Sequence, residues 1–311
     1  MANRLAIHRE DRATSSRGGG NRARTRARGD GDAGALNTDQ IGLYEDPVIY
    51  DILHEPGTLS EVRTLERVWR RVSGDSPRNA LEPACGTARY LSRLASSGWA
   101  VCGFDSDSAM VKFSRAKLRK RDARVWQGRF DRFGNKVGEG SIGLAFCLIN
   151  SIRHVASDAE MIRHLKLIRR ALAPSGVYAV GISLSAYGLE APTEDVWTGT
   201  RRGISIKQVV SYTPAEGGSR PRERGERVDS VLEIRRGGLT EIRSSSYSLF
   251  SYSREQWETV INRSGLRVIG MVNEFASKFD PGRIGYAIWL LARPDHPLAA
   301  RRGITGLRRS G

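Results

Sequence analysis

Short apolar runs alternate with amphipathic helical stretches between residues 59 and 184, and this alternation constrains the fold more than any other feature. The apolar runs have the length of buried strands and lie at residues 79–84, 99–105, 123–128, 141–150 and 177–184. The helical stretches lie at residues 59–72, 87–98, 108–121 and 157–172. Because parallel strands need long crossover connections, this order predicts an α/β fold. We expect a doubly wound, mostly parallel sheet with helices on both faces.

The pattern changes after residue 184. Three strand-like stretches, at residues 203–212, 227–237 and 240–252, are joined by polar turns and predict an inserted antiparallel β meander. A helix over residues 253–265 and two further strands then follow, which brings the main sheet to seven strands. The chain is expected to divide into a basic disordered tail (1–35), an N-terminal helical cap (36–75), a core (76–185 and 253–293), a meander that covers the substrate (186–252) and a basic C-terminal tail (294–311).

The chain is strongly basic, with a formal net charge of +16. Residues 1–35 hold eight Arg and four acidic residues, and residues 293–311 hold five Arg and one acidic residue, so the two ends carry half of that charge. The first segment is poor in apolar residues, which predicts disorder. Nucleic acid stays open as a partner of these basic tails, although no basic-aromatic RNA-binding motif accompanies them.

The cysteines and the hydropathy pattern predict the compartment. Cys85, Cys102 and Cys147 form no regularly spaced framework, so we interpret them as reduced thiols of a cytoplasmic protein. None lies near another Cys or His at zinc-ligand spacing, and no metal is expected. No apolar run approaches the roughly 18 residues of a membrane span, so no membrane partner is expected.

The stretch ALEPACGTARYL, residues 80–91, lies where the first predicted strand turns into a helix, which is where doubly wound folds bind ligands. Its small residues let the backbone approach a ligand, and the helix start offers free N–H groups. About twenty residues later, Asp105 ends the second strand, where an acid accepts hydrogen bonds from ribose hydroxyls. A pyrophosphate site needs more glycines than Gly86 alone, and Glu82 would repel it. An ammonium beside Glu82 is favourable, so the residues favour a nucleoside that carries an amino acid.

These segments resemble those of the class I S-adenosylmethionine-dependent methyltransferases. ALEPACGTARYL is similar to the family's first motif, an acid followed by a G-x-G-x-G loop, with Ala84 and Ala88 in place of the outer glycines. GFDSDSAM, WQGRFDRF, FCLINSIRHV and LAPSGVYAV resemble the later segments in the same order. Many family members carry an acid beside the adenine amino group, where this chain has Arg129, so backbone groups near residues 128–130 are expected to serve instead.

The resemblance implies a Rossmann-like core and S-adenosyl-L-methionine as the cofactor. The residues expected to bind it are Tyr50, Glu82, Ala84, Cys85, Gly86, Arg89, Asp105, Ser106, Met110, Gly128, Arg129, Phe130 and Leu148. Two interpretations of Arg89 stay open, a ligand of the cofactor carboxylate or a surface residue. Tyr44 or Tyr50 is either a lid over the cofactor or an anchor of its own helix.

The resemblance also implies the type of reaction, a transfer of the methyl group by in-line displacement, in which the protein aligns donor and acceptor and excludes water. Asn150, Ser151 and Tyr44 are candidate acceptor contacts, and His154 is a weak candidate for a general base, with a structural loop histidine as the alternative. Five aromatic residues of the inserted region either line an acceptor pocket or pack the meander: Trp197, Tyr212, Tyr247, Phe250 and Tyr252.

We therefore expect a methyltransferase that acts on the N, O or C atom of a small molecule. Two alternatives stay open: an RNA or protein methyltransferase that uses the basic tails, and a non-catalytic binding protein on the same fold.

Overall fold

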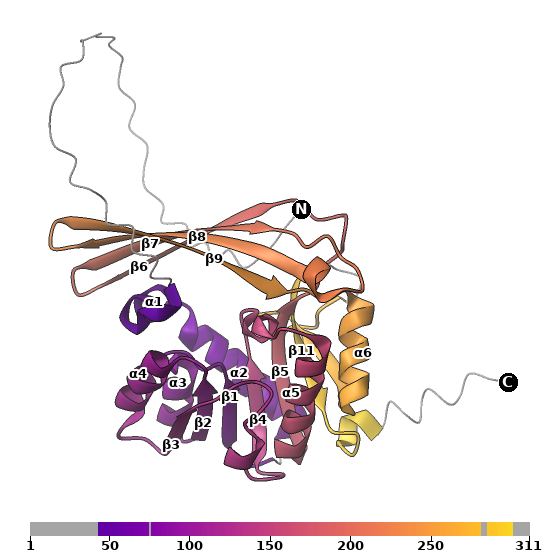
Figure 1. Ribbon diagram of the computed structural model, residues 1–311. Helices are drawn as coiled ribbons and strands as arrows, with labels where there is room; N and C mark the ends of the chain where they lie inside the picture. The colour runs from indigo at the N-terminus through magenta and orange to yellow at the C-terminus, as the bar shows by residue number, and fades with distance from the viewer. Residues whose placement is uncertain (1–42, 75, 281–284, 301–311) are drawn as a thin grey trace, which may run out of the picture.

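The computed structural model describes residues 43–74, 76–280 and 285–300, which contain two β-sheets and the helices around them (Figure 1). The strands of the larger sheet are β1 (Asn79–Pro83), β2 (Ala100–Asp105), β3 (Ala123–Gln127), β4 (Ile142–Cys147), β5 (Leu172–Ser183), β10 (Arg267–Val272) and β11 (Tyr286–Ala292). The α-helices are α1 (Pro47–His54), α2 (Thr58–Ser73), α3 (Arg89–Ser96), α4 (Ser108–Leu118), α5 (Asp158–Ala171) and α6 (Arg254–Ser264).

The larger sheet has the strand order β10-β11-β5-β4-β1-β2-β3. Strands β1 to β5 pair in parallel, whereas β11 is antiparallel to both of its neighbours. The prediction of a doubly wound, mostly parallel seven-stranded sheet is confirmed. From β1 the chain adds β2 and β3 on one side, and it then returns to add β4 and β5 on the other side. The point where the order of addition switches lies between β1 and β4. The carboxyl ends of these two strands form the crevice in which such folds bind ligands.

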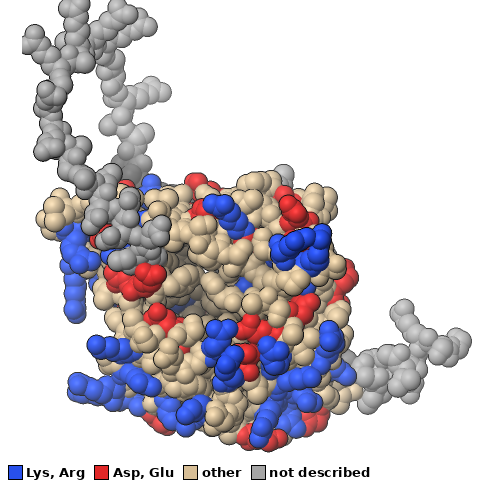
Figure 2. Space-filling view, viewed as in Figure 1, with Lys and Arg blue, Asp and Glu red and all other residues tan. Residues whose placement is uncertain are grey.

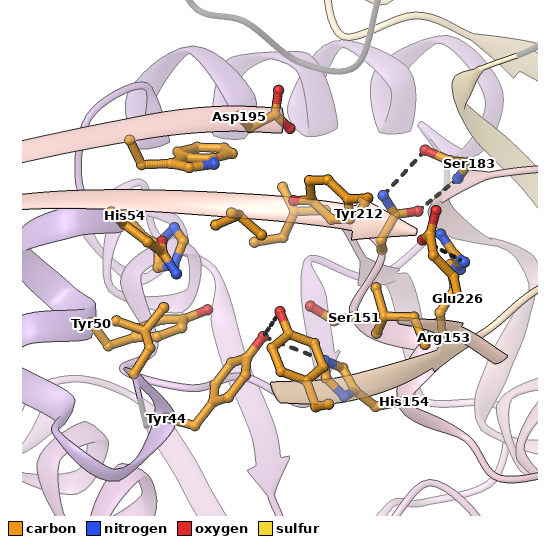
Figure 3. A pocket seen from close by; sticks show the side chains of 18 of the residues that line it. Tyr44, Tyr50, His54, Ser151, Arg153, His154, Ser183, Asp195, Tyr212 and Glu226 are labelled. Atoms are coloured by element: carbon orange, nitrogen blue, oxygen red, sulfur yellow. Dashed lines mark hydrogen bonds and ion pairs between the residues drawn. The ribbon is translucent and has the colours of Figure 1, made fainter. Parts of the chain in front are cut away.

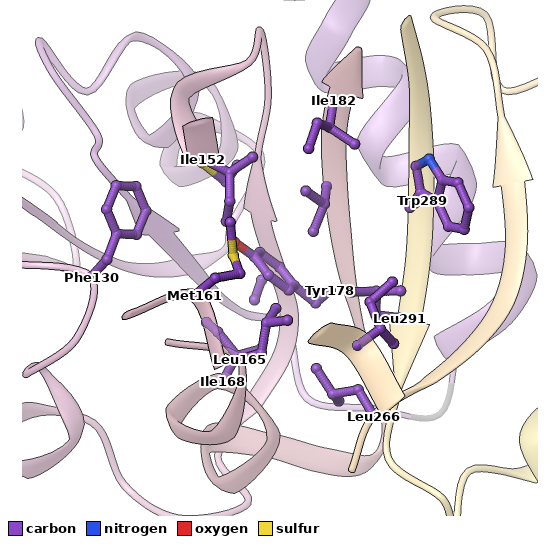
Figure 4. Packing of buried hydrophobic residues seen from close by; sticks show 14 of the residues in the cluster. Phe130, Ile152, Met161, Leu165, Ile168, Tyr178, Ile182, Leu266, Trp289 and Leu291 are labelled. Carbon is purple, nitrogen blue, oxygen red and sulfur yellow. The ribbon is translucent and has the colours of Figure 1, made fainter. Parts of the chain in front are cut away.

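Helices cover both faces of this sheet. On one face lie α5 and α6, and Met161 and Leu165 of α5 pack beside Tyr178 of β5 in a buried cluster that also includes Ile182 (Figure 4). On the other face lie α2, α3 and α4, whose apolar residues belong to a second buried cluster. The cap expected over residues 36–75 is therefore shorter than predicted. Of the described residues 43–74, α1 and the short 3₁₀ helix before it (Leu43–Glu45) lie at the strand ends, whereas α2 buries an apolar stripe against the core.

The smaller sheet is an antiparallel meander between β5 and α6. Its strands, in the order in which they pair, are β6 (Thr193–Arg201), β7 (Ile204–Thr213), β8 (Gly225–Arg236) and β9 (Leu239–Phe250). It lies across α1 (Figure 1), where Ile49, Ile52 and Leu53 pack against Ile206 and Leu232.

The antiparallel meander is confirmed, but the prediction of three strands is wrong, because β6 was missed. The inward side chains of β6 include Asp195 and Trp197, which face a cavity, so the strand shows no apolar alternation. Gly199 marks the contact of β6 with α1, because a Cβ there would lie 2.6 Å from the carbonyl oxygen of Ile52.

The two terminal segments were both predicted to be tails, and the structure describes only the start of the C-terminal one. The disordered tail predicted over residues 1–35 lies outside the described residues, as do residues 301–311. Residues 294–300, which were assigned to the C-terminal tail, instead pack on the core, where His296 is buried. No helix in the described part of the chain has the length and apolar character needed to cross a membrane.

Candidate active site

The loop between β1 and α3 has the backbone of a glycine loop even where glycine is missing. Ala84, Gly86 and Ala88 all have left-handed φ angles, of 52°, 49° and 55°. Alanine adopts this region at a cost of about 1–2 kcal/mol, whereas glycine does so freely. The two substitutions therefore preserve the shape of the motif and leave strain in the loop.

Restoring glycine at Ala84 and Ala88 should stabilise the protein by about 0.5 kcal/mol per site, because relief of strain exceeds the extra entropy of the unfolded chain. The affinity for S-adenosylhomocysteine should not change, since the loop already has its glycine-like backbone. Denaturant unfolding and calorimetry measure the two quantities. The control is Ala116→Gly at an exposed position in the last turn of α4, which should cost up to about 1 kcal/mol. A loss of stability at position 84 or 88 would contradict the strain argument.

A cavity at the carboxyl ends of β1 and β4 adjoins this loop. It brings together six of the residues predicted to bind the cofactor: Tyr50, Glu82, Ala84, Cys85, Arg89 and Leu148. Cys147, Ile149 and Ser151 complete its wall on the β4 side. Tyr50 comes from α1 and lies over the loop, since a Cβ added to Gly86 would meet the Tyr50 ring at 3.3 Å.

Glu82 places a buried carboxyl group in this cavity. The residue is 5% exposed, and its Oε2 atom has no hydrogen-bond partner among the described residues. Burial raises the pKa of the carboxyl group well above its usual value, although the positive charge of Arg89 opposes the shift. A buried carboxylate without a partner is unfavourable. The site therefore fits a ligand that brings an ammonium group to Glu82, as the amino-acid part of S-adenosylmethionine does.

Arg89 matches neither of its two predicted roles fully. It is buried rather than on the surface, and its Nη1 atom donates to Glu61 Oε2 at 2.7 Å and to Thr58 Oγ1 at 2.8 Å. Its Nη2 atom also contacts the Tyr90 hydroxyl. The surface interpretation is wrong, because α2 covers the side chain and neutralises its charge. Arg89 still lines the cavity.

Asp105 joins the end of β2 to the loop. Its Oδ2 atom accepts a hydrogen bond from the backbone N–H of Gly86 at 2.8 Å, and Oδ1 accepts from that of Asp107 at 3.0 Å. A carboxylate has about four acceptor positions, so Asp105 can also accept from ribose hydroxyls. The N–H of Gly128 donates to the Asp105 carbonyl at 2.9 Å, which places the end of β3 beside it.

The remaining residues predicted to bind the cofactor lie near Asp105 but do not line the cavity. Ser106 is exposed at the start of the β2–α4 turn, whereas Met110 is buried in the first turn of α4. Arg129 is largely exposed and lies 3.6 Å from Glu160. The carbonyl oxygen of Phe130 already lies 3.1 Å from His164 Nδ1.

A second, larger cavity lies between the strand ends of the core and the smaller sheet, where the surface is hollowed in Figure 2. It shares Tyr50, Ile149 and Ser151 with the first cavity. Its wall is formed by Leu43, Tyr44, Tyr50, His54, Ile149, Asn150, Ser151, Arg153, His154, Ser183, Asp195, Trp197, Gln208, Val210, Tyr212, Glu226, Tyr247, Leu249 and Tyr286. The two cavities thus meet at the carboxyl end of β4.

The backbone is strained at this junction. Ile149 and Asn150 follow β4 with left-handed φ angles of 49° and 64°, and such a conformation is exceptional for a β-branched residue. The Tyr286 hydroxyl accepts the Ile149 N–H at 3.1 Å, and Asn150 Oδ1 accepts the Ser183 N–H at 2.7 Å. Asn150, a candidate acceptor contact, lines the larger cavity, and its side chain also ties the segment after β4 to β5.

His154 faces the larger cavity in company with two tyrosines (Figure 3). Its Nε2 atom lies 3.4 Å from the Tyr44 hydroxyl, which is 3.5 Å from that of Tyr247. The Tyr247 ring also stacks on the His154 ring. The His154 side chain keeps access to solvent, but the surrounding protein, with a smaller contribution from the charge of Arg153, lowers its pKa below the usual value. The ring is therefore a neutral hydrogen-bonding group near pH 7.

The aromatic residues of the inserted region divide into two groups. Trp197, Tyr212 and Tyr247 line the larger cavity, whereas Phe250 and Tyr252 are buried in the core cluster. Sequence reasoning missed several wall residues altogether: His54, Arg153, Glu226 and Tyr286. No local sequence pattern identifies Arg153, Glu226 or Tyr286 as wall residues, because long-range packing brings them to the cavity.

The chain is similar to known methyltransferases in sequence and in fold. A family model described as a methyltransferase domain matches residues 80–176. A Streptomyces fradiae dTDP-3-amino-3,6-dideoxy-alpha-D-glucopyranose N,N-dimethyltransferase is 26% identical over 226 residues, which cover 71% of this chain and 83% of that protein.

Two solved structures have the same fold. The sugar N-methyltransferase KedS8 of a Streptoalloteichus species gives a TM-score of 0.63 at 18% identity, over 85% of this chain and all of that one. The SAM-bound amino pentose methyltransferase CalS10 of Micromonospora echinaspora gives 0.58 at 17% identity, over 78% of this chain and 94% of that one. Residues 80–176 thus form a methyltransferase domain, and the chain is a methyltransferase with S-adenosylmethionine as its methyl donor.

Proposed function

We propose that this methyltransferase acts on the amino nitrogen of a small acceptor, and that the acceptor is an amino sugar. The observation that carries the proposal is the larger cavity, which meets the cofactor cavity at Ile149 and Ser151 and is walled on the opposite side by the smaller sheet. Such an enclosed position suits a small molecule better than a polymer, which would need an open groove. The relatives named above act on amino sugars, which supports the choice of acceptor.

The charges of the larger cavity also favour an amine. Asp195 and Glu226 contribute carboxylates to its wall, while His54 and His154 are neutral near pH 7, because the protein around the partly buried His54 and the exposed His154 lowers their pKa values. The pKa of His54 falls to about 3. Arg153 is the only Lys or Arg in the described wall, and it forms an ion pair with Glu226. A cationic or neutral amine can therefore enter without meeting an uncompensated positive charge.

S-adenosylmethionine, when bound, supplies an electrophilic methyl group, and Glu82, Asp105 and the β1–α3 loop would hold it. An amine attacks as the neutral base, through its lone pair. The neutral ring of His154 can accept a hydrogen bond from the amine N–H and so orient that lone pair towards the junction of the cavities. The N–C bond would form as the S–CH3 bond breaks, so that a neutral thioether leaves and the nitrogen becomes a cationic ammonium, which then gives its proton to water. A strong general base is not required, so His154 serves as an orienting acceptor.

A methyl-transfer assay with purified protein tests this proposal. A nucleotide-linked amino sugar should be methylated, whereas the analogue with a hydroxyl in place of the amine should not. His154→Asn should lower kcat by roughly tenfold, the value of one hydrogen bond, and leave the affinity for S-adenosylhomocysteine unchanged. Asp105→Ala is the matched control, since it should weaken that affinity. Methylation of the hydroxyl analogue at the same rate, or of RNA instead of either sugar, would reject an amine-specific small-molecule enzyme.

A further inference from the structure

Arg153 precedes His154 in a short 3₁₀ helix, Ser151–His154, and its side chain extends into the protein rather than out of it. The residue is 1% exposed. Its Nη2 atom lies 2.9 Å from Glu226 Oε2, and the Glu226 side chain is 2% exposed. Two further hydrogen bonds reach the end of the smaller sheet, to the Phe250 carbonyl at 3.2 Å and to Ser251 Oγ at 2.8 Å. One side chain thus ties the segment after β4 to β8, to β9 and to the residue after β9.

The stability of the fold does not by itself explain this ion pair. Removing two charges from water costs several kcal/mol, and apolar residues of similar volume often replace such a pair without loss of stability. A buried pair does provide a fixed geometry, because an arginine fork bonds in few orientations. Arg153 and Glu226 both line the larger cavity together with His154, and Arg153 is its neighbour in the chain.

We propose that Arg153 is a positioning residue, which through its ion pair with Glu226 of the smaller sheet holds His154 at the acceptor cavity. The inference rests on the proposed function, because it presumes that His154 orients the acceptor. On this proposal the smaller sheet contributes to the acceptor site in two ways. The sheet forms one wall of the cavity, and Glu226 of the sheet fixes Arg153, which precedes His154 in the chain.

The charged and titratable groups around His154 determine its pKa, which can be followed by NMR. Tyr44 from the segment before α1 and Tyr247 from β9 contact the ring, Arg153 lies on its own element, and Glu226 of β8 lies behind Arg153. Besides the surrounding protein, the positive charge of Arg153 helps to hold the pKa of His154 low. Loss of that charge should raise the pKa of His154 towards the ordinary value of about 6.5.

The test replaces the ion pair by apolar residues in the full-length protein, as Arg153→Met combined with Glu226→Leu. We expect kcat for the amine acceptor to fall by roughly tenfold, as in His154→Asn, with little change in KM for S-adenosylmethionine. NMR titration of the His154 ring should show a raised pKa. Arg153→Lys provides a second variant, which keeps the charge but not the fork, so it should lower kcat and leave the His154 pKa low.

Arg224→Met is the matched control. Arg224 also fastens the smaller sheet to the core, through Asp158 at 2.9 Å and the Ser251 carbonyl at 3.1 Å, but it does not line the larger cavity. This variant should lower the melting temperature and leave kcat and the His154 titration unchanged. Equal effects of Arg224→Met, or a wild-type kcat and titration in the double variant, would overturn the positioning role. If His154→Asn is fully active, the proposed function of His154 fails instead, so the two failures are distinguishable.

Discussion

Replacing Glu82 by Gln should weaken the binding of S-adenosylhomocysteine about 10- to 100-fold, because the buried carboxylate is the group that an ammonium would neutralise. A hydrogen bond to a charged group contributes about 1.5–3 kcal/mol, and each 1.4 kcal/mol is a tenfold change in affinity. The same variant should make the unliganded protein more stable near neutral pH, since it removes a buried ionisable group without a partner. Calorimetry and thermal unfolding measure the two effects, which have opposite signs.

The pH dependence follows from the direction of the pKa shift. Burial raises the pKa of Glu82 in the folded protein, so the folded state binds its proton more tightly than the unfolded state. The stability of the unliganded protein should therefore fall as the pH rises from the unfolded value of about 4.3 through the folded pKa. Glu82→Gln should lack this dependence. Ligand binding in that range should release a proton, which calorimetry in buffers of different ionisation enthalpy detects.

Glu139→Gln provides the matched control, because the side chain of Glu139 is 67% exposed and pairs with Arg170 on the surface. It should change neither the affinity nor the stability measurably. If Glu82→Gln binds S-adenosylhomocysteine as tightly as the wild type, the ammonium of the ligand lies elsewhere, and the unpaired carboxylate needs another explanation.

The parts of the site that could be predicted are those encoded within one strand–turn–helix unit. The apolar run before Glu82, the small residues after it and the acid at Asp105 form a local pattern, and the parallel sheet brings their ends together. The sign of φ at Ala84 and Ala88 was not accessible, because alanine by itself favours the right-handed region. The loop holds these residues in the left-handed region through the contacts of the folded protein.

The acceptor side could be predicted only in outline, because its wall comes from segments far apart in the chain. Arg153 and Glu226 are distant in sequence, and each alone resembles an ordinary surface charge. Strand β6 lacks apolar alternation for the same reason, since Asp195 and Trp197 face a cavity and not a core. Where a polar side chain faces a ligand site, the pattern that identifies strands fails.

The smaller sheet, α1 and the core also meet at Asp51, and Asp51→Asn should loosen all three. The Asp51 side chain is 3% exposed, and its two oxygens lie 2.6 Å from Lys117 Nζ on α4 and 2.7 Å from Arg201 Nη1 on β6. Breaking a buried ion pair costs about 3–5 kcal/mol, and water at the two partly exposed cations should reduce the loss to about 2 kcal/mol. Because α1 also carries Tyr50, the KM for the acceptor and the affinity for S-adenosylhomocysteine should both worsen. Denaturant unfolding and initial-rate kinetics measure these changes.

Two comparisons distinguish the loss of the Asp51 ion pairs from a general loss of stability. They are the pH range over which stability changes and the effect of breaking a second ion pair of α1. Burial alone would raise the pKa of Asp51, but the hydrogen bonds from Lys117 and Arg201 outweigh it and lower the pKa. The contribution of Asp51 is therefore complete above the unfolded value of about 3.9 and is lost as the pH falls through the folded pKa. Glu55 pairs with Arg93 from the end of α1, with both side chains at least one third exposed, and Glu55→Gln should cost less than about 1 kcal/mol. If the two variants lose equal stability, or if Asp51→Asn leaves the kinetics intact, α1 does not depend on the buried carboxylate to hold Tyr50 between the two cavities.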